Sequence, residues 1–261
     1  MKKLKLALLG CGYLNEIVAS AIENNYLPEY ELVAAMGRDH KRTEEFARRH
    51  KCIPCTSMSQ LLALEPDYIA EAASPAAIRE YSEVILKGGS NLVVLSIGAF
   101  ADEALYERVK KVASENNKKV YIASGAVGGF DVLRTAALMS PIKATMTSKK
   151  WPASLYYTPL YREGLLEIKE PEQVFSGTTK EAIDMLPFHF NVAVATALAS
   201  AGPNNTTLNI DAVPGFRGDE YKIEIVGDEV RTDLNIYSRT CNIAAWSVVA
   251  VLQNIVSPIV F

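Results

Sequence analysis

The sequence predicts an α/β protein in which a domain built on a parallel sheet precedes a smaller α+β domain with an open sheet. In the first half of the chain, short apolar runs alternate with segments of helical periodicity, which is typical of repeated strand–helix–strand units. After about Ser124, strands in which polar and apolar residues alternate become frequent, as in sheets with one solvated face. The two halves are therefore expected to fold as different domains.

Five apolar runs in the first half have the length of buried strands, and helical segments separate them. The predicted strands are residues 5–9, 32–36, 68–72, 92–96 and 119–122, and the predicted helices are residues 16–24, 41–50, 57–64, 75–88 and 102–116. Ser74 is a suitable N-cap for the fourth helix, and Pro75 fits its first turn. Strands joined through such helices form right-handed crossovers, which predicts a parallel sheet.

The second half is expected to combine strands with three helices. The predicted strands are residues 144–149, 173–176, 206–211, 221–226 and 229–236, and the predicted helices are residues 180–185, 192–201 and 243–255. Lys222 and Glu224 alternate with apolar neighbours, which predicts a sheet with one face in water. The last helix is almost entirely apolar and is expected to pack back on the first domain. The expected domains are residues 1–123 and 124–242, with residues 243–261 returning to the first.

The composition restricts the classes of function. The chain has 261 residues, a formal net charge of −3, 49% hydrophobic residues and 22% charged residues. This balance is that of a globular protein, and the charge disfavours binding to nucleic acid. No apolar run reaches the roughly 18 residues of a membrane span. Four cysteines are too few for a disulfide scaffold, so a cytoplasmic protein is expected. From the charge and the short apolar runs, neither nucleic acid nor a membrane is expected as a partner.

A glycine-rich turn follows the first predicted strand. Gly10, Gly12, Tyr13 and Leu14 lie where a Gly-x-Gly-x-x-Gly loop joins a strand to a helix and holds the pyrophosphate of a dinucleotide at the helix N-terminus. The third position of the motif is Asn15. The first domain is therefore expected to be of the Rossmann type and to bind NADP or NAD. A glycine turn in a flavodoxin-like fold without a nucleotide is the alternative.

The end of the second predicted strand bears on the choice of coenzyme. An NAD site usually has Asp or Glu there, which accepts a hydrogen bond from the ribose 2′-hydroxyl. Gly37 occupies this position and Arg38 follows it, so a 2′-phosphate is not repelled and can pair with the guanidinium. NADP is therefore the preferred prediction. Asp39 would be the ribose ligand if the turn were longer, which keeps NAD open.

Three segments of small residues follow other predicted strands, at the edge where open α/β sheets bind ligands. Small residues let a nicotinamide ring lie against the backbone, and free N–H groups can hold a carboxylate. The expected cofactor ligands in the first two segments are Ser74, Pro75, Ser96, Gly98 and Ala99, and the expected substrate ligands in the third are Ser124, Gly125 and Ala126.

These segments and three others resemble the L-aspartate dehydrogenases, small NAD(P)-dependent enzymes with a Rossmann domain and an α+β catalytic domain. The matching segments are residues 71–75 with 80–82, 96–102, 124–131, 150–152, 174–177 with 181–182, and 187–193. The resemblance implies hydride transfer between the nicotinamide and the Cα of aspartate. The product, iminosuccinate, hydrolyses to oxaloacetate and ammonia, and the reverse direction is reductive amination. Asn191, in the last segment, is expected to contact the cofactor.

The chain departs from the family pattern at the positions that the resemblance makes catalytic. The family's Ala-Asp-Pro is Ala-Val-Pro at residues 212–214, and its Asn-x-His, which carries the proposed acid/base, is Asp-Glu-Tyr at residues 219–221. The family's Asn-x-Asn is His-Phe-Asn at residues 189–191, and its Lys-Thr-Ser is Arg-Thr-Cys at residues 239–241.

Several side chains are candidates for the roles of the missing residues. The reference pKa of imidazole, about 6.5, suits His189 as a relocated acid/base, although a histidine bonded at a helix start is the alternative. Tyr221, with a reference pKa near 10, would be a base only if a cation such as Lys150 or Arg239 lowered its pKa. Its alternative role is to fill the space of the lost histidine. Lys150, Arg239 and Thr240 are candidates for contact with the substrate, and surface charge is the alternative for the two cations.

Other functions remain compatible with the sequence. One is a dinucleotide-binding sensor or partner protein without aspartate dehydrogenase activity, and another is a dehydrogenase of a hydroxy acid or polyol. His40 and His50 are expected at the surface. Cys52 and Cys55 are interpreted as packing residues and not as metal ligands, because no second ligand pair accompanies them. A homodimer formed through the open face of the second sheet is expected from the architecture.

Overall fold

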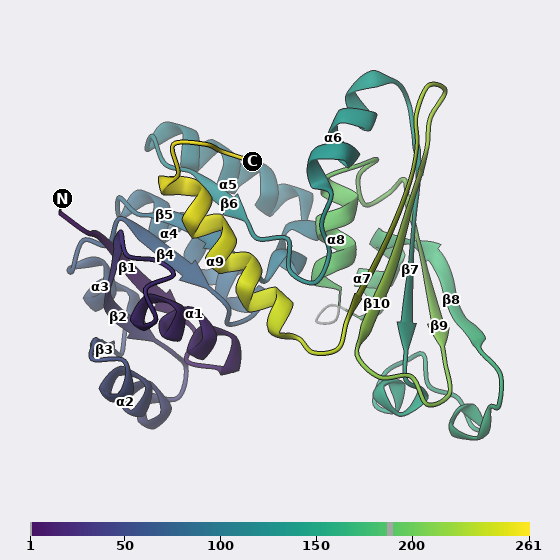
Figure 1. Cartoon of the computed structure of the whole chain (residues 1–261), viewed down its shortest axis with the longest axis horizontal. Coiled ribbons are helices and arrows are strands. Elements are labelled where there is room, and N and C mark those ends of the chain that lie inside the picture. Colours follow the sequence, from purple (N-terminus) through teal and green to yellow (C-terminus); the bar gives the residue numbers. More distant parts are fainter. Residues whose placement is uncertain (1, 187–189) are drawn as a thin grey trace. The chain divides into compact units, whose positions relative to one another are not determined.

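The computed structural model describes residues 2–186 and 190–261. The chain divides into two compact units, Met1–Gly125 with Asn242–Phe261, and Ala126–Cys241 (Figure 1). The first unit contains a six-stranded parallel sheet and the second a five-stranded mixed sheet, which confirms the predicted fold class. Across the described residues, no helix is long and apolar enough to cross a membrane.

The sheet of the first unit has the strand order β3-β2-β1-β4-β5-β6. Its strands are β1 (Leu4–Leu9), β2 (Tyr30–Met36), β3 (Ile53–Cys55), β4 (Tyr68–Glu71), β5 (Asn91–Val94) and β6 (Val120–Ile122). The order reverses between β1 and β4, where the loops at the carboxyl ends diverge and leave room for a ligand. The sequence does not predict β3, because three residues around Pro54 carry little periodicity. Proline is tolerated there because β3 is an edge strand.

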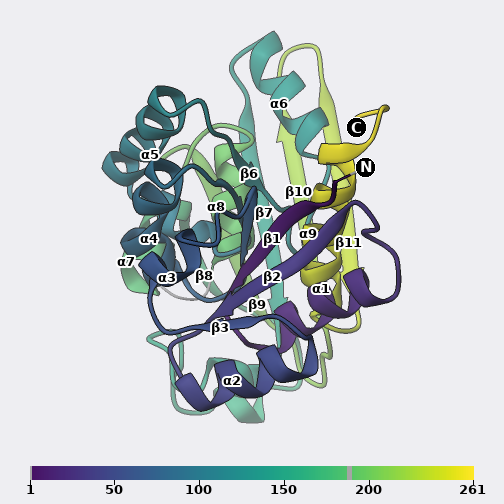
Figure 2. The same ribbon diagram turned by 90° about the vertical axis from the view of Figure 1, so that its left-hand side faces the viewer.

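Helices cover both faces of this sheet. They are α1 (Tyr13–Glu23), α2 (His40–Arg49), α3 (Met58–Leu62), α4 (Pro75–Lys87) and α5 (Glu103–Glu115), with a 3₁₀ helix η1 (Ile97–Ala101) after β5. Side-chain caps at Asp39, Ser57, Ser74 and Asp102 start α2, α3, α4 and α5, which explains why the sequence locates these helices within a few residues. Figure 2 shows α4 and α5 on the opposite face of the sheet from α1.

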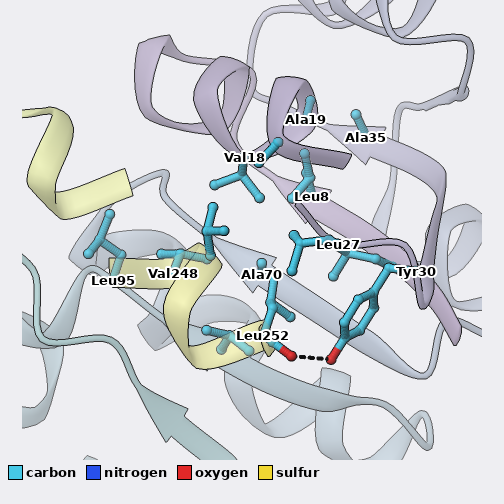
Figure 3. Packing of buried hydrophobic residues seen from close by; sticks show 14 of the residues in the cluster. Leu8, Val18, Ala19, Leu27, Tyr30, Ala35, Ala70, Leu95, Val248 and Leu252 are labelled. Atoms are coloured by element: carbon cyan, nitrogen blue, oxygen red, sulfur yellow. Dashed lines mark hydrogen bonds between the residues drawn. The ribbon is translucent and has the colours of Figure 1, made fainter. Parts of the chain in front are cut away.

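The last helix, α9 (Asn242–Val256), belongs to the first unit. Its residues Val248 and Leu252 join the buried cluster that contains Leu8 and Val18 of β1 and α1 (Figure 3). The buried Tyr30 hydroxyl donates a 2.8 Å hydrogen bond to the Leu252 carbonyl oxygen (Figure 3). Apolar packing and this bond fix α9 against the face that α1 also covers.

The second unit has the strand order β11-β10-β7-β9-β8. Its strands are β7 (Lys143–Lys150), β8 (Glu172–Thr178), β9 (Thr206–Ala212), β10 (Asp219–Val226) and β11 (Arg231–Ser238). The helices α6 (Phe130–Met139), α7 (Thr179–Met185) and α8 (Asn191–Leu198) lie along one face (Figure 1). On the other face the side chains are polar, and Lys222 pairs with Glu224 at 2.7 Å, as the alternation in the sequence predicts.

Helix α6 was not predicted from the sequence. The segment before it is rich in glycine and indicates only a ligand-binding loop. Gly129 forms the N-cap of α6 with a φ of +73°, a conformation that glycine adopts at no steric cost. The glycine therefore starts a helix instead of interrupting one.

Candidate functional site

The turn between β1 and α1 has the geometry of a phosphate-binding loop. Gly10 has a φ of +106°, and a Cβ there would lie 2.7 Å from the Ala72 carbonyl oxygen, so only glycine fits. Gly12 is the N-cap of α1 without a side-chain cap, and a Cβ built on it would meet no described atom within 4 Å. Tyr13 and Leu14 are the first helical residues. Open space therefore faces the N–H groups that begin α1, and the turn fits a dinucleotide pyrophosphate.

Asn15 takes the place of the third glycine and is fully buried. Its Nδ2 donates hydrogen bonds to the carbonyl oxygens of Leu9, at 3.0 Å, and Gly10, at 2.7 Å. Among the described residues, its Oδ1 has no hydrogen-bond partner. The amide therefore ties the start of α1 to the end of β1, and it replaces the close backbone packing that glycine would permit.

The turn after β2 leaves no space for an acid at position 37. A Cβ on Gly37 would lie 2.9 Å from Thr43 Oγ1 and 3.2 Å from Cys11 Sγ. The Asp39 carboxylate caps α2 by accepting a 3.1 Å hydrogen bond from the Arg42 N–H. Arg38 is exposed beside them. The turn therefore presents a cation, while its carboxylate already serves as a helix cap.

The loops after β4 and β5 carry the other predicted cofactor ligands of this unit. Ser74 caps α4, with Oγ accepting a 3.2 Å hydrogen bond from the Ala77 N–H, and Pro75 is the first helical residue. Ser96 precedes η1, in which Gly98 and Ala99 are buried. Because all strands of the sheet are parallel, these loops and the phosphate-binding loop lie at the same edge.

The predicted substrate ligands of the third loop lie where the chain leaves the first unit. Ser124 and Gly125 are the last residues of the first unit before Ala126 begins the second. Gly125 has a φ of +67°, and its N–H donates a 3.0 Å hydrogen bond to the Ser247 hydroxyl of α9. This N–H therefore holds the chain on α9, and Ala126 is buried.

The second unit brings Lys150 and Tyr221 together around Asp219. Lys150 Nζ lies 3.3 Å from Asp219 Oδ1, and the Tyr221 hydroxyl donates a 3.3 Å hydrogen bond to the same oxygen. Lys150 Nζ also lies 5.4 Å from the centre of the Tyr221 ring, within the range of a cation–π interaction. No role was predicted for Asp219 from the sequence. Its position two residues before Tyr221 on one strand is the signal that places both side chains on one face.

The condition under which Tyr221 would act as a base, a pKa lowered by a nearby cation, is not met. Tyr221 is 6% exposed, and burial raises its pKa, with the Asp219 carboxylate adding to the rise. Lys150 does not reverse this rise in the pKa, because its ammonium group is itself paired with Asp219. Tyr221 therefore keeps its proton and acts as a hydrogen-bond donor at neutral pH.

The remaining predicted residues lie elsewhere in the second unit. Asn191 is the first residue of α8. Arg239 and Thr240 are exposed after β11, where the Ser238 hydroxyl donates to the Thr240 carbonyl oxygen at 2.6 Å. His189 lies outside the described residues.

The expectation that His50 lies at the surface is wrong, whereas His40 is exposed. The His50 side chain is 6% exposed and joins α2 to α1. Its Nε2 lies 2.7 Å from Glu16, and its Nδ1 lies 2.9 Å from Glu23. The two carboxylates come from another helix, so the local sequence around His50 does not indicate this burial.

Fold and loop geometry define a Rossmann domain of the dinucleotide-binding type, and the matches to known proteins make the protein an NAD(P)-dependent dehydrogenase. Residues 10–123 match the profile of the NAD-binding domain of homoserine dehydrogenase. Residues 131–255 match the profile of the C-terminal domain of aspartate dehydrogenase.

The chain belongs to the L-aspartate dehydrogenase family. It is 30% identical to the L-aspartate dehydrogenase of Methanococcus maripaludis over 98% of both chains, and 30% identical to that of Methanosarcina acetivorans with the same coverage. The crystal structure of aspartate dehydrogenase from Thermotoga maritima matches with a TM-score of 0.77 and 26% identity, covering 99% of each chain. The family predicted from the sequence is confirmed, and the protein is an oxidoreductase resembling L-aspartate dehydrogenase.

Proposed function

We propose that the protein transfers hydride between NADP or NAD and the Cα of L-aspartate, or of a closely related amino acid. The oxidised product is an imino acid, which water converts to the keto acid and ammonia; the reverse direction is reductive amination. The observation that carries this proposal is the open phosphate-binding loop at Gly12, in a chain that matches L-aspartate dehydrogenases from end to end.

The proposed cofactor site consists of the loops at the carboxyl edge of the first sheet. The N–H groups that begin α1 would hold the pyrophosphate, and the loops at Ser74 and Ser96 would flank the nicotinamide half. When bound, the nicotinamide accepts or donates the hydride. The polypeptide supplies position and charge. We assign Asn191 to contact with the cofactor on the basis of the family motif.

We propose NADP as the preferred coenzyme. Arg38 is exposed at the turn where a 2′-phosphate would lie, and within the described chain no ion pair involves it. The packing around Gly37 leaves no room for the acid that would bind a ribose 2′-hydroxyl. Asp39, the alternative acid, already caps α2.

The substrate carries two carboxylates and an amine. Arg239 is exposed, and no ion pair involves it in the described part of the chain, which supports it over the paired Lys150 as a carboxylate ligand. Thr240, Ser124, Gly125 and Ala126 remain proposed neighbours of the substrate. Tyr221 is proposed as a donor that keeps its proton, and Lys150 as the cation that balances Asp219 beside it. We propose His189 for the acid/base role, because the reference pKa of imidazole, about 6.5, suits proton transfer near neutral pH.

We further propose a cytoplasmic homodimer. Cys11, Cys52, Cys55 and Cys241 are free thiols, which supports a reducing compartment. The uncovered face of the second sheet supports pairing between two copies, through rows of hydroxyl, amide and charged side chains such as Thr147, Asn209 and Asn235. Sedimentation equilibrium would give twice the mass of the chain for a dimer, and the mass of one chain would contradict it.

The test of the proposed activity is oxidation of NADPH and NADH at 340 nm with oxaloacetate and ammonia, for the wild type and for His189→Ala. Turnover that the substitution abolishes supports both the reaction and the relocated acid/base. Turnover that is unchanged removes His189 from the mechanism. Coenzyme binding without turnover would favour the sensor, which Val213 and Tyr221 in the usual places of Asp and His also suggest.

A further inference from the structure

Glu71 is a fully buried carboxylate in the middle of the carboxyl edge of the first sheet. It is the last residue of β4, and β4 lies between β1 and β5 at the point where the strand order reverses. An ionised group in such a place is costly unless hydrogen bonds replace its water. The signal in the sequence is an acid at the end of an otherwise apolar strand.

Backbone donors from two separate loops satisfy this carboxylate. Oε1 accepts hydrogen bonds from the N–H groups of Ala73, at 2.7 Å, and Ser74, at 2.9 Å. Oε2 accepts a 3.0 Å hydrogen bond from the N–H of Ser96. The first two donors lie in the loop between β4 and α4, and the third lies in the loop between β5 and η1. One side chain therefore fixes the spacing of both loops.

The phosphate-binding loop rests on the same structure. The Cα of Gly10 packs so closely on the peptide that joins Ala72 to Ala73 that an added Cβ would lie 2.7 Å from the Ala72 carbonyl oxygen. Ala73 is one of the residues that Glu71 holds. A shift of the Ala72–Ala73 peptide would therefore move the surface against which the turn at Gly10 packs.

Energetically, Glu71 balances burial against hydrogen bonding. Burial raises its pKa, and the hydrogen bonds from the Ser96 hydroxyl and from the three N–H groups oppose that rise. Charge-assisted hydrogen bonds of this kind are about twice as strong as neutral ones. The donors are thus held more firmly than a neutral acceptor would hold them.

We propose that Glu71 is a positioning residue for the dinucleotide: it fixes the three loops that form the proposed cofactor site without touching the cofactor. This inference rests on the proposed cofactor site at this edge. It assigns to Glu71 a part of the coenzyme affinity, and none of the affinity for the amino-acid substrate.

The test is the affinity of Glu71→Gln and Glu71→Asp for NADPH and NADH, measured by fluorescence titration. The amide of glutamine places an NH₂ group against backbone N–H donors, so we expect the dissociation constant to rise at least tenfold. Aspartate keeps the charge but is shorter by one methylene, so we expect an intermediate rise. With saturating coenzyme, the KM for the amino acid should stay within twofold of the wild-type value.

Ser90→Ala is the matched control. Ser90 is fully buried at the opposite end of the same sheet, just before β5, and its hydroxyl donates a 2.7 Å hydrogen bond to the Pro66 carbonyl oxygen. This variant should lower the thermal midpoint without changing the dissociation constant. Equal weakening of binding in Ser90→Ala and Glu71→Gln would overturn the proposal, because the effect would then be general destabilisation.

Two further outcomes are decisive. An unchanged dissociation constant in Glu71→Gln would overturn the positioning role. If Glu71→Gln does not fold, the dissociation constant of Glu71→Asp, which retains the charge, takes its place: an unchanged value would overturn the positioning role. Failure of the wild type itself to bind either dinucleotide would contradict the proposed cofactor site, which separates that result from a failure of the proposal for Glu71.

Discussion

The hydroxyl of Tyr221 donates a hydrogen bond to Asp219 across 3.3 Å, at the start of β10. The same carboxylate oxygen pairs with Lys150 at the end of β7. In the family pattern, a histidine proposed as acid/base occupies the position of Tyr221. A buried phenol bonded to a carboxylate has different chemistry, because it keeps its proton and donates a hydrogen bond.

Tyr221→Phe removes this hydroxyl and little else. If the phenol O–H turns from Asp219 to the substrate during catalysis, kcat should fall by roughly 100-fold, with a smaller change in KM. The measurement is steady-state kinetics with L-aspartate and saturating coenzyme. Tyr237→Phe is the control, because Tyr237 is an exposed tyrosine on β11 that bonds only the Arg217 carbonyl oxygen among the described groups. Equal rates for wild type and Tyr221→Phe would assign Tyr221 a packing role.

The two glycines of the phosphate-binding loop should respond differently to alanine. Gly10→Ala strains a left-handed residue and forces Cβ against the Ala72 carbonyl, so stability should fall by roughly 1–3 kcal/mol. Gly12→Ala meets no described atom and should fold normally, but its Cβ occupies the space that the pyrophosphate needs.

We therefore expect Gly12→Ala to keep its thermal midpoint and to lose at least tenfold in affinity for both coenzymes. Thermal unfolding and coenzyme titration measure the two effects. For Gly10→Ala, the control is Gly89→Ala, which measures backbone strain without a steric clash. Gly89 has a φ of +89°, and a Cβ there would meet no described atom within 4 Å. Normal coenzyme binding by Gly12→Ala would mean that the pyrophosphate does not approach this turn.

Coenzyme preference should depend on Arg38. Arg38→Ala should raise the dissociation constant of NADPH by about 10- to 100-fold, the range for loss of a charged hydrogen bond, and leave that of NADH nearly unchanged. Arg48→Ala, at the other end of α2, is the control. A parallel weakening of NADH and NADPH would contradict contact with the 2′-phosphate.

A conversion to NAD by Gly37→Asp alone should fail. The new side chain would collide with Thr43 Oγ1, so stability should fall by about 1–3 kcal/mol. Gly37→Asp combined with Thr43→Ala removes the closest obstacle and should recover part of this loss. Chemical unfolding of the single and double variants measures the difference. Equal stability of the wild type and Gly37→Asp would show that the turn relaxes more easily than its packing suggests.

Stability should fall at alkaline pH because of two buried phenols. Burial raises the pKa of Tyr30 and Tyr221 above the ordinary value near 10. Above that pH, the unfolded chain releases these protons while the folded chain retains them. The free energy of unfolding should therefore decrease as the pH rises, by up to about 1.4 kcal/mol per pH unit for each phenol.

Urea unfolding between pH 8 and pH 11 measures this dependence. Tyr30→Phe should flatten the alkaline slope, and it should also cost about 1 kcal/mol at pH 8, because the hydrogen bond to Leu252 is lost. Tyr157→Phe, at a tyrosine that is 95% exposed, should leave the slope unchanged. An unchanged slope in Tyr30→Phe would mean that Tyr30 does not retain its proton in the folded state.

Local sequence determined the elements whose signals lie within a few residues. The run before Gly10 and the glycine turn predicted β1, the phosphate-binding loop and α1, because backbone freedom at glycine is a property of a single residue. Ser74 located the start of α4, because capping acts over three residues. The structure shows that Asp102 caps α5 in the same way. The alternation of polar and apolar residues around Lys222 predicted the solvated face of β10, because successive side chains of a strand point to opposite faces of the sheet.

Tertiary structure alone decided the environments of the titratable groups. Asp219 pairs with Lys150 across 69 residues of sequence, and the burial of Tyr221 raises the pKa of its phenol, so that it cannot serve as a base. The two ring nitrogens of His50 lie within hydrogen-bond distance of two carboxylates of α1. The carboxylate of Glu71 accepts hydrogen bonds from N–H groups up to 25 residues away in the sequence. A pKa depends on desolvation and on charges that the fold brings together, so no local pattern encodes it. The glycine loop, in contrast, depends on the conformational freedom of its own glycines, and this freedom follows from the identity of each residue alone.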